Sequence, residues 1–239
     1  MIAITAATPF ETTFISDQLT HPCPVALGKY TALRGRFAAV PVLTFHIGVG
    51  KTNSAHGITL LLEKFKPELL LLIGCGGAYR KSGLVPGDLA IASEEIFGDD
   101  GVITPHGWRS MQYLHFPLLR AGRHIFYNRF PADRGVVRKA KAILRAFHPK
   151  VGPFVTVSEV TGTDRKADEM EKRFGGICEN MEGAAAAQFC TLYGVPFLEI
   201  RGISNMVKQR NKREWNLPAA ARISQEAARE IIIHWGNNR

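Results

Sequence analysis

The stretch PELLLLIGCGG, residues 67–77, decides the fold class of this chain. Residues 69–73 are all large aliphatic residues, with no polar residue at the alternate positions. A strand that is covered on one face alternates apolar and polar residues, whereas a strand covered on both faces has a continuous apolar run. Residues 67–74 are therefore predicted to form a central strand with helices on both sides of its sheet.

Segments with the period of a strand alternate with segments with the period of a helix on both sides of this stretch. Strands are expected at residues 1–6, 39–47, 87–94, 153–158, 176–182 and 195–204, and helices at 10–19, 53–65, 133–147, 164–174, 183–194 and 215–235. This alternation predicts the α/β class, with a three-layer α/β/α sandwich around a central mixed β-sheet. No linker divides residues 1–239, so we expect one domain, with an irregular insertion at about 98–132.

The composition limits the class of protein. Hydrophobic residues make up 46% of the chain and charged residues 21%, which is ordinary for a globular protein with a sizeable core. No apolar run approaches the roughly 18 residues that span a bilayer, so no membrane partner is expected. The four cysteines lie far apart without a C-x-x-C pair. This spacing argues against a zinc site or a disulfide framework, and a cytoplasmic protein without metal or cofactor is expected.

The formal net charge of +9 has two possible meanings. A basic protein can bind nucleic acid, but the basic residues here are spread over segments such as 134–145 and 208–213 without interleaved aromatic residues. We therefore expect no nucleic-acid partner. The charge then reflects solvated helix faces or attraction of an anionic small substrate.

The glycine-rich turn at residues 48–52, GVGKT, suggests a phosphate-binding P-loop. That loop requires G-x-x-x-x-G-K-[ST], because its first glycine lets the backbone turn and point N–H groups at the phosphates. Counting back from Gly50, the first glycine belongs at position 45, which is Phe45. A bulky residue at that position excludes the P-loop.

Glycines or polar residues follow three of the predicted strands, at Cys75-Gly76, at residues 179–182 and at Ser204-Asn205, while Glu11 follows the first strand. Ligands of open α/β sheets bind at the carboxyl ends of strands. Each group alone also fits a structural role as a tight turn, a helix-start charge or a cap. Together, two carboxylates without a metal-ligand cluster suit hydrolysis at a glycosidic carbon, where one activates water and the other holds hydroxyl groups.

The runs GVGKTNSA (48–55), LLEKFKPELLLLIGCGGA (61–78), LVPGDLAIASE (84–94) and ENMEGAAAAQFCTLYGVPFLEIRGISN (179–205) resemble the nucleoside phosphorylase/nucleosidase superfamily. The resemblance is strongest to its hydrolytic branch, which contains methylthioadenosine/S-adenosylhomocysteine nucleosidase and futalosine hydrolase. It covers most of the chain, is specific in M-E-[AG]-A-A and R-[AG]-I-S-[DN], and is weak in 98–132. It implies a nucleoside phosphorylase-like fold, in which the G-[IV]-G-K turn starts a helix near the active site.

The resemblance also implies roles for individual residues. Glu11 matches the glutamate that positions and deprotonates the attacking water, and Glu182 matches the acceptor of the ribose 2′- and 3′-hydroxyls. Substrate-binding positions around the sugar and base are Cys75, Gly76, Val160, Thr161, Met181 and Ser204. Phosphorolysis is not expected, because the carboxylate of Glu11 repels phosphate and no arginine precedes Arg34.

The residue at position 205 is expected to set the choice of base. Adenine-specific nucleosidases have Asp where this chain has Asn205. An amide cannot act as a general acid, but it can donate to a 6-oxo group and accept the N7–H of the departing base. This order suits hypoxanthine or guanine, so the resemblance implies futalosine as substrate and hypoxanthine as product, in menaquinone biosynthesis.

Futalosine carries a benzoate on its 5′ side, for which Arg109 and Arg129 in the insertion are candidate ligands. A loop rich in arginine and aromatic residues is also typical of a subunit interface. The alternative substrates are methylthioadenosine, S-adenosylhomocysteine or inosine-like nucleosides; a non-catalytic nucleoside or RNA-binding protein is a more distant alternative. Relatives pair through helices beside the active site, so a homodimer or larger homo-oligomer is expected.

Overall fold

The computed structural model describes residues 1–236, and the last three residues of the expected domain lie outside them. The apolar run of residues 69–73 begins β5 (Leu69–Ala78), the central strand of a ten-stranded mixed sheet. The other strands of this sheet are β1 (Ile2–Ala6), β2 (Thr20–Leu27), β3 (Tyr30–Phe37), β4 (Val40–His46), β6 (Leu89–Phe97), β11 (Arg129–Pro131), β12 (Lys150–Thr156), β13 (Cys178–Asn180) and β14 (Phe197–Met206).

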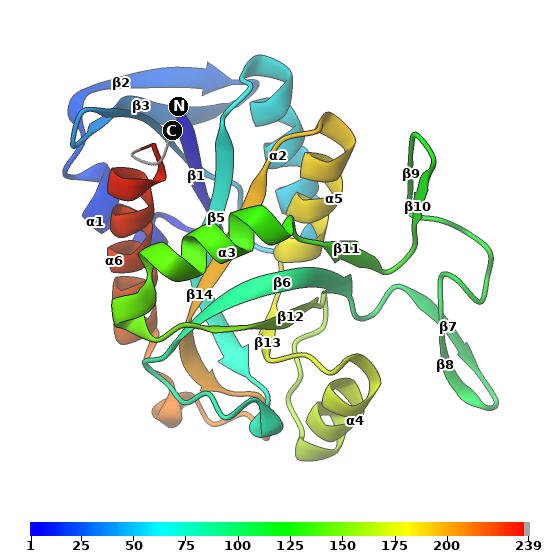
Figure 1. Cartoon of the computed structure of the whole chain (residues 1–239). Helices are drawn as coiled ribbons and strands as arrows, with labels where there is room; N and C mark the ends of the chain where they lie inside the picture. Colours follow the sequence, from blue (N-terminus) through cyan, green and yellow to red (C-terminus); the bar gives the residue numbers. More distant parts are fainter. Residues whose placement is uncertain (237–239) are drawn as a thin grey trace.

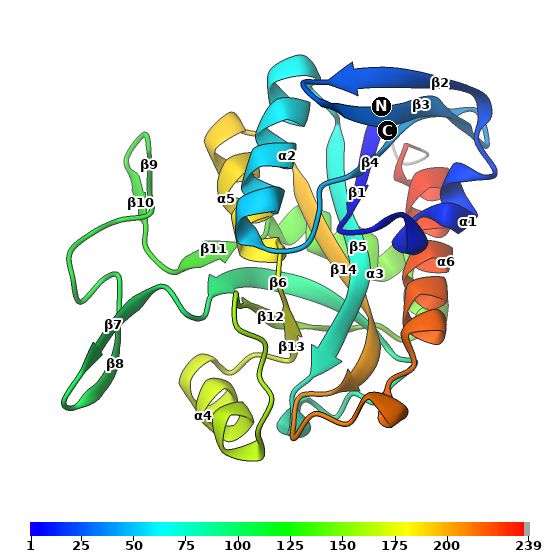
Figure 2. The same cartoon turned by 180° about the vertical axis from the view of Figure 1, so that it is seen from behind.

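Helices cover both faces of the sheet, as Figures 1 and 2 show from opposite sides. They are α1 (Thr13–Ser16), α2 (Lys51–Lys64), α3 (Arg134–Ile143), α4 (Asp164–Phe174), α5 (Gly183–Tyr193) and α6 (Leu217–Trp235). Leu69, Leu71 and Ile73 pack with α3 and α6, whereas Leu70 and Leu72 pack with α2 and α5. Both faces of β5 are therefore buried, which explains its unbroken apolar sequence. The predicted α/β/α sandwich around a mixed sheet is confirmed.

Five strands of the sheet pair in a closed ring. β5 pairs with β14, β14 with β6, β6 with β12, β12 with β13, and β13 returns to β5. β1 and β4 continue from the other side of β5 in parallel, and the β2–β3 hairpin extends the sheet to one edge. β2 forms one edge of the sheet and β11 the other. The ring brings the ends of β5, β13 and β14 together.

Two expectations about the elements were wrong. Residues 10–19 form only a short 3₁₀ turn and α1, because the chain then turns into β2 and β3, a hairpin that was not predicted. Residues 98–132 are not simply irregular. They contain two hairpins, β7 (Gly101–Thr104) with β8 (Gly107–Ser110) and β9 (Leu119–Ala121) with β10 (His124–Phe126), which project from the body in Figure 1.

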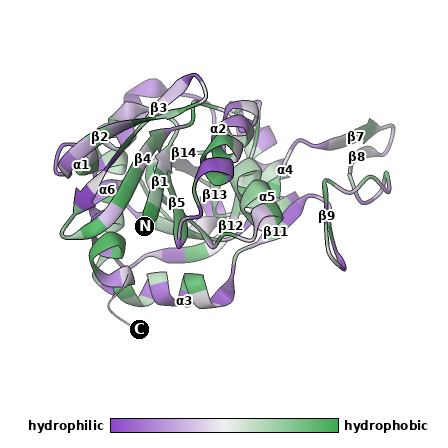
Figure 3. Cartoon of the chain, turned by 90° about the horizontal axis from the view of Figure 1, so that it is seen from above, coloured by the Kyte–Doolittle hydropathy of each residue, from purple (hydrophilic) through white to green (hydrophobic). Residues whose placement is uncertain are grey.

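The distribution of polar residues agrees with these layers. In Figure 3 the strands β1, β4 and β5 are largely hydrophobic, whereas α3 shows hydrophilic stretches. None of the helices within residues 1–236 is both long enough and apolar enough to cross a membrane.

Candidate active site

A cleft of about 330 Å³ lies where β1, β5, β13 and β14 end. It is lined by all the site residues expected from the sequence except two arginines: Glu11, Cys75, Gly76, Val160, Thr161, Met181, Glu182, Ser204 and Asn205. These residues come from five separate regions of the chain. They meet because the sheet brings the ends of its strands to one place.

Glu11 is fixed by backbone and side-chain donors on the turn after β1. Its Oε2 accepts hydrogen bonds from the backbone N–H and the hydroxyl of Thr8, both at 3.0 Å. Its Oε1 accepts one from the backbone N–H of Cys75, also at 3.0 Å. The side chain is only 7% exposed but lines the cleft, and its hydrogen bonds set its orientation. One lone pair of Oε1 has no donor among residues 1–236.

Glu182 explains the glycine-rich turn that resembles a P-loop. Gly50, which has φ 94° and precedes α2, donates its N–H to Glu182 Oε1 at 3.0 Å. The turn thus binds a carboxylate of the protein itself. Lys51, the lysine of the GKT sequence, points elsewhere and pairs with Asp99, at 2.6 Å, and with Asp100. It anchors the start of the segment that carries the two hairpins.

Arg201 is a buried cation that pairs with one of the two cleft carboxylates, Glu182. Its Nη2 donates to Glu182 Oε2 at 3.0 Å and its Nη1 to the carbonyl of Cys75 at 3.1 Å. A Cβ on Gly74 would lie 2.6 Å from Glu11 Oε1 and 2.7 Å from Arg201 Nη1, so this glycine leaves the space that both side chains occupy. Burial would lower the pKa of Arg201, but the surrounding carboxylates raise it well above its ordinary value.

A second pair of carboxyl groups lies beneath Arg201. Glu199 Oε1 accepts from Arg201 Nε at 2.7 Å, while Glu95 Oε2 accepts from the hydroxyl of Thr156 at 2.9 Å and from the amide of Asn180 at 3.2 Å. The two remaining oxygens, Glu95 Oε1 and Glu199 Oε2, are buried and have no hydrogen-bond partner among residues 1–236. Burial and then the charge of Glu199 raise the pKa of Glu95 well above its ordinary value. The raised pKa favours a proton on Glu95, while Glu199 is paired with the guanidinium of Arg201.

Glu179 holds the loop after β12 against the sheet. Its carboxylate accepts from the N–H of Thr161 at 3.0 Å, from the hydroxyl of Thr161 at 2.6 Å and from Tyr79 at 2.8 Å. Burial raises the pKa of Glu179, while the donors on Thr161 lower it in part. This residue positions Val160 and Thr161 along the cleft.

The amide of Asn205 has a defined orientation. Ser204 donates its hydroxyl to Asn205 Oδ1 at 2.7 Å, and Asn205 Nδ2 donates to the carbonyl of Met206 at 3.0 Å. An amide has two hydrogens and two lone pairs on its oxygen. Asn205 therefore keeps one donor and one acceptor for a ligand in the cleft.

Cys75 lines the cleft but is not poised as a nucleophile. Burial, and then the charge of Glu11, raise the pKa of its thiol to about 12. A thiol acts as a nucleophile only when it is deprotonated. Among residues 1–236, no group of three or more His, Cys, Asp or Glu side chains is placed to hold a metal ion.

The structure does not bring Arg109 and Arg129 into this cleft. Arg109 lies on β8, in a projecting hairpin, and stacks on Tyr113 with 5.9 Å between guanidinium and ring. Arg129 lies on the edge strand β11, where it pairs with Glu94 at 2.6 Å and donates to the carbonyl of Phe174. Neither arginine therefore lines the cleft of its own chain, and a contact of either with the substrate stays a prediction.

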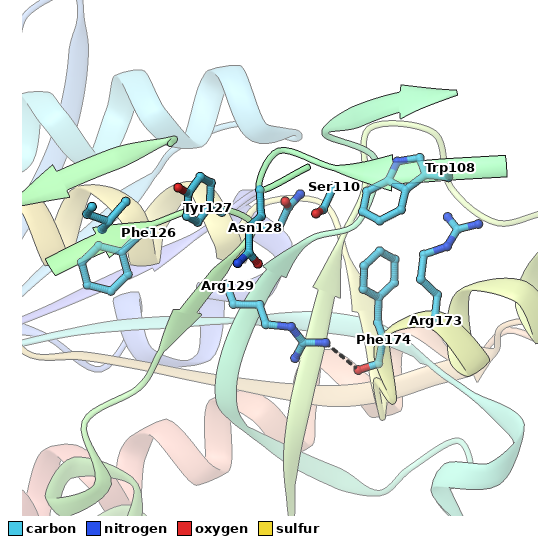
Figure 4. A pocket seen from close by; sticks show the side chains of 10 residues that line it. Trp108, Ser110, Phe126, Tyr127, Asn128, Arg129, Arg173 and Phe174 are labelled. Carbon is cyan, nitrogen blue, oxygen red and sulfur yellow. Dashed lines mark hydrogen bonds between the residues drawn. The ribbon is translucent and has the colours of Figure 1, made fainter. Parts of the chain in front are cut away.

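Figure 4 shows where Arg129 lies instead. It lines a separate hollow of about 460 Å³, with Trp108 and Phe174 edge to face and Arg173 over the Trp108 ring at 4.8 Å. The side-chain amide of Asn128 in this hollow accepts a hydrogen bond from the backbone N–H of Met111 and donates to the backbone carbonyls of Phe97 and Asp100. The polar groups of Asn128 thus hold the insertion together.

The sequence reasoning missed Arg201, Glu199 and Glu95 as site residues. A signal was present, because Glu199 and Arg201 stand two residues apart in the otherwise apolar strand FLEIRGIS and so lie on the same face. Charged residues are almost never fully buried unless they are paired. Their partners on β6 and at the start of α5 could not be read from the sequence.

Comparisons with known proteins agree with this architecture. The family model of the phosphorylase superfamily matches residues 1–233. A futalosine hydrolase of Thermus thermophilus is 32% identical over 192 residues, which cover 80% of this chain and 81% of the relative. A 5′-methylthioadenosine/S-adenosylhomocysteine nucleosidase of Maridesulfovibrio salexigens is 31% identical over 212 residues, 87% of each.

The fold is shared with a solved structure of the 5′-methylthioadenosine/S-adenosylhomocysteine nucleosidase of Neisseria meningitidis in complex with methylthio-immucillin-A. Its TM-score is 0.83 at 23% identity, covering 97% of both chains. The match of the family model to nearly the whole chain, and the two relatives above 30% identity, establish the family. This chain belongs to the phosphorylase superfamily.

Proposed function

We propose that this protein is a purine nucleosidase that hydrolyses the N-glycosidic bond of futalosine and releases hypoxanthine, as a step of menaquinone biosynthesis. Relatives named as futalosine hydrolases and relatives named as methylthioadenosine/S-adenosylhomocysteine nucleosidases both match at about 30% identity. Both names describe enzymes that hydrolyse the N-glycosidic bond of a purine nucleoside. The observation that carries the choice of futalosine is the amide of Asn205 in the cleft.

In this proposal Glu182 binds the ribose. Each of its oxygens already accepts one hydrogen bond, from Gly50 or from Arg201, and keeps a lone pair for the 2′- or 3′-hydroxyl. As the C1′–N9 bond breaks, positive charge develops on the ribosyl group. The fixed carboxylates of Glu182 and Glu11 stabilise this charge without having to reorient.

Glu11 activates water. The lone pair of its Oε1 that is left free by Cys75 accepts a proton of the water molecule whose oxygen attacks C1′. The C1′–N9 bond breaks, a C1′–O bond forms, and the leaving base takes a proton at N7 from solvent. Glu11 returns to solvent the proton that it took from the attacking water. A carboxylate at this place repels phosphate, which favours water as the nucleophile.

Asn205 recognises the base. Its free amide hydrogen donates to a 6-oxo group, and the free lone pair of its Oδ1 accepts N7–H. An adenine base presents a donor at position 6, so its 6-amino group would face the amide hydrogen. A buried mismatch of this kind is strongly penalised.

The test is release of base from futalosine, inosine and methylthioadenosine by the purified protein, in buffer with and without phosphate. We expect hypoxanthine from futalosine, no acceleration by phosphate, and little adenine from methylthioadenosine. Asn205→Asp should shift the preference toward methylthioadenosine. If the wild type releases adenine from methylthioadenosine as fast as it hydrolyses futalosine, the role of Asn205 is refuted. That result would favour the second candidate function, a methylthioadenosine/S-adenosylhomocysteine nucleosidase, because relatives with that name are about as similar to this chain as the futalosine hydrolases.

A homodimer or larger homo-oligomer in the cytoplasm is also part of this proposal. It is supported by the four free cysteines, which suit a reducing compartment, and by exposed apolar side chains on the insertion, such as Ile103 and Phe116. Light scattering of the purified protein would test the oligomeric state.

A further inference from the structure

We propose that Arg210 binds an anionic substituent on the 5′ side of the substrate and that Trp215 positions its guanidinium. Both residues lie in the segment between β14 and α6, and both line the cleft. This inference rests on the proposed nucleosidase function. It replaces Arg109 and Arg129 as the cationic contacts of that substituent.

Arg210 is a cation without a carboxylate partner among residues 1–236. Glu214 is the one carboxylate between β14 and α6, and it is occupied by Lys208 at 2.5 Å and by the amide of Asn211 at 2.9 Å. The guanidinium of Arg210 instead lies over the ring of Trp215, 4.7 Å from its centre. The other arginine of the cleft, Arg201, is fully engaged by carboxylates. Arg210 therefore supplies the free positive charge of this cleft.

The segment is tied to the opposite side of the cleft by its backbone. Arg210 donates its N–H to the carbonyl of Gly162, and Gln209 donates its N–H to Asp164 at 3.0 Å. At its other end, Asn216 donates to the carbonyl of Ser204 at 2.8 Å. These contacts fix the backbone of Arg210 beside the Val160–Thr161 loop, and its exposed side chain lines the cleft.

The rest of the cleft rim is apolar. Phe10, Val49, Val160 and Leu217 line the cleft and are each between 38% and 50% exposed. The cleft floor, in contrast, carries the carboxylates of Glu11 and Glu182. Exposed apolar side chains with one free cation fit a substituent that has an aromatic or aliphatic body and a single negative charge.

The 5′ position follows from the chemistry of a bound nucleoside. C1′ carries the base, and Glu182 is proposed to hold the 2′- and 3′-hydroxyls. Only the 5′ carbon is then free to carry a further group toward the rim. A carboxylate on that group would form a hydrogen-bonded ion pair with Arg210, whose planar guanidinium suits it.

The experiment compares kcat/KM for futalosine, its methyl ester and inosine in the wild type and in Arg210→Gln. The ester keeps the aromatic body and removes the charge. We expect Arg210→Gln to lower kcat/KM for futalosine roughly tenfold to hundredfold, mainly through KM, and to leave inosine and the ester unchanged within about twofold. The matched control is Arg213→Gln, an exposed arginine of the same segment that does not line the cleft, and it should change none of the three.

Equal losses for all three substrates in Arg210→Gln would mean a structural role and would overturn the inference, as would an unchanged KM for futalosine. Arg210→Lys should recover part of the loss, because it restores the charge without the planar donor pair. If the wild type releases no hypoxanthine from futalosine, the proposed function fails separately. The role of Arg210 is then tested with the adenine analogue of futalosine, which has the same carboxylate. If the wild type prefers this analogue over methylthioadenosine and Arg210→Gln abolishes the preference, the inference is supported. If the wild type shows no such preference, the inference is overturned.

Discussion

Replacing Gly183 by alanine should disturb the active site through the buried acids beneath it. Gly183 is the first residue of α5, directly after Glu182. A Cβ at this position would lie 2.1 Å from Glu199 Oε2 and 2.4 Å from Glu95 Oε2, whereas ordinary contacts begin at 3.4 Å. The carboxyl groups must therefore move by more than 1 Å. Glu199 cannot move without straining its 2.7 Å bond to Arg201.

The expected cost follows from these contacts. Overpacking a filled core costs about 1–3 kcal/mol, and breaking a buried ion pair costs about 3–5 kcal/mol. Partial displacement should thus lower the free energy of unfolding by about 3 kcal/mol, which corresponds to a fall in Tm of roughly 6–12 °C for a chain of this size. Because Arg201 also holds Glu182, kcat/KM for the nucleoside substrate should fall as well.

Thermal unfolding and base-release kinetics of Gly183→Ala measure both effects. Gly236→Ala is the matched control, since no atom of residues 1–236 lies within 4 Å of an added Cβ there and its φ is −82°. The double variant Gly183→Ala/Glu199→Ala should lose less than the sum of its single losses, because removal of the carboxylate makes room for the methyl group. A Gly183→Ala protein with the Tm and activity of the wild type would refute the buried arrangement of these acids.

Three further predictions concern single groups. Burial raises the pKa of Glu95 well above its ordinary value of 4.5, so the folded protein keeps a proton that the unfolded chain loses as the pH rises above 4.5. The free energy of unfolding of the wild type therefore falls as the pH rises above that value, and the Tm of Glu95→Gln relative to the wild type should increase with pH. A difference in Tm that stays constant with pH would contradict this. At neutral pH iodoacetamide should alkylate the exposed Cys23 but not Cys75, because burial and the charge of Glu11 raise the pKa of the Cys75 thiol to about 12. Peptide mass spectrometry measures the labelling, and rapid alkylation of Cys75 would show that its thiol is not shielded. Lys51→Met should lower the free energy of unfolding by about 1–2 kcal/mol, because the ion pairs of Lys51 with Asp99 and Asp100 are lost. MgATP should not raise the Tm of the wild type, and stabilisation by MgATP would restore the P-loop interpretation.

The layers of the fold could be predicted because their signals are local. The helix expected at 164–174 forms at those residues, and α5 ends at Gly194, which has φ 66° as a left-handed cap requires. The β2–β3 hairpin was missed because β2 is mostly exposed and lacks a buried apolar run. The strands of the insertion are only three or four residues long, too short to show a period.

Of the candidate site, only the residues at the ends of strands could be predicted from the sequence. Glu11, Glu182 and Asn205 meet because the sheet brings strand ends together, which is a rule of topology. The partners of Arg201 depend on which buried charges face one another, and a single sequence does not contain that pairing. Arg109 and Arg129 lie outside the cleft of their own chain, which could not be foreseen because composition indicates an insertion but not its direction.

The two edges of the sheet affect how the chain avoids self-association during folding. β2 contains Pro22 and Pro24, and the three-residue β11 ends at Pro131. Proline has no N–H to offer to an incoming strand, and the short β11 leaves such a strand little to pair with. Growth of the sheet by addition of a strand from another molecule is therefore blocked at both ends. High recovery on refolding from denaturant at high protein concentration would follow, and aggregates rich in intermolecular β-structure should form only after these prolines are replaced.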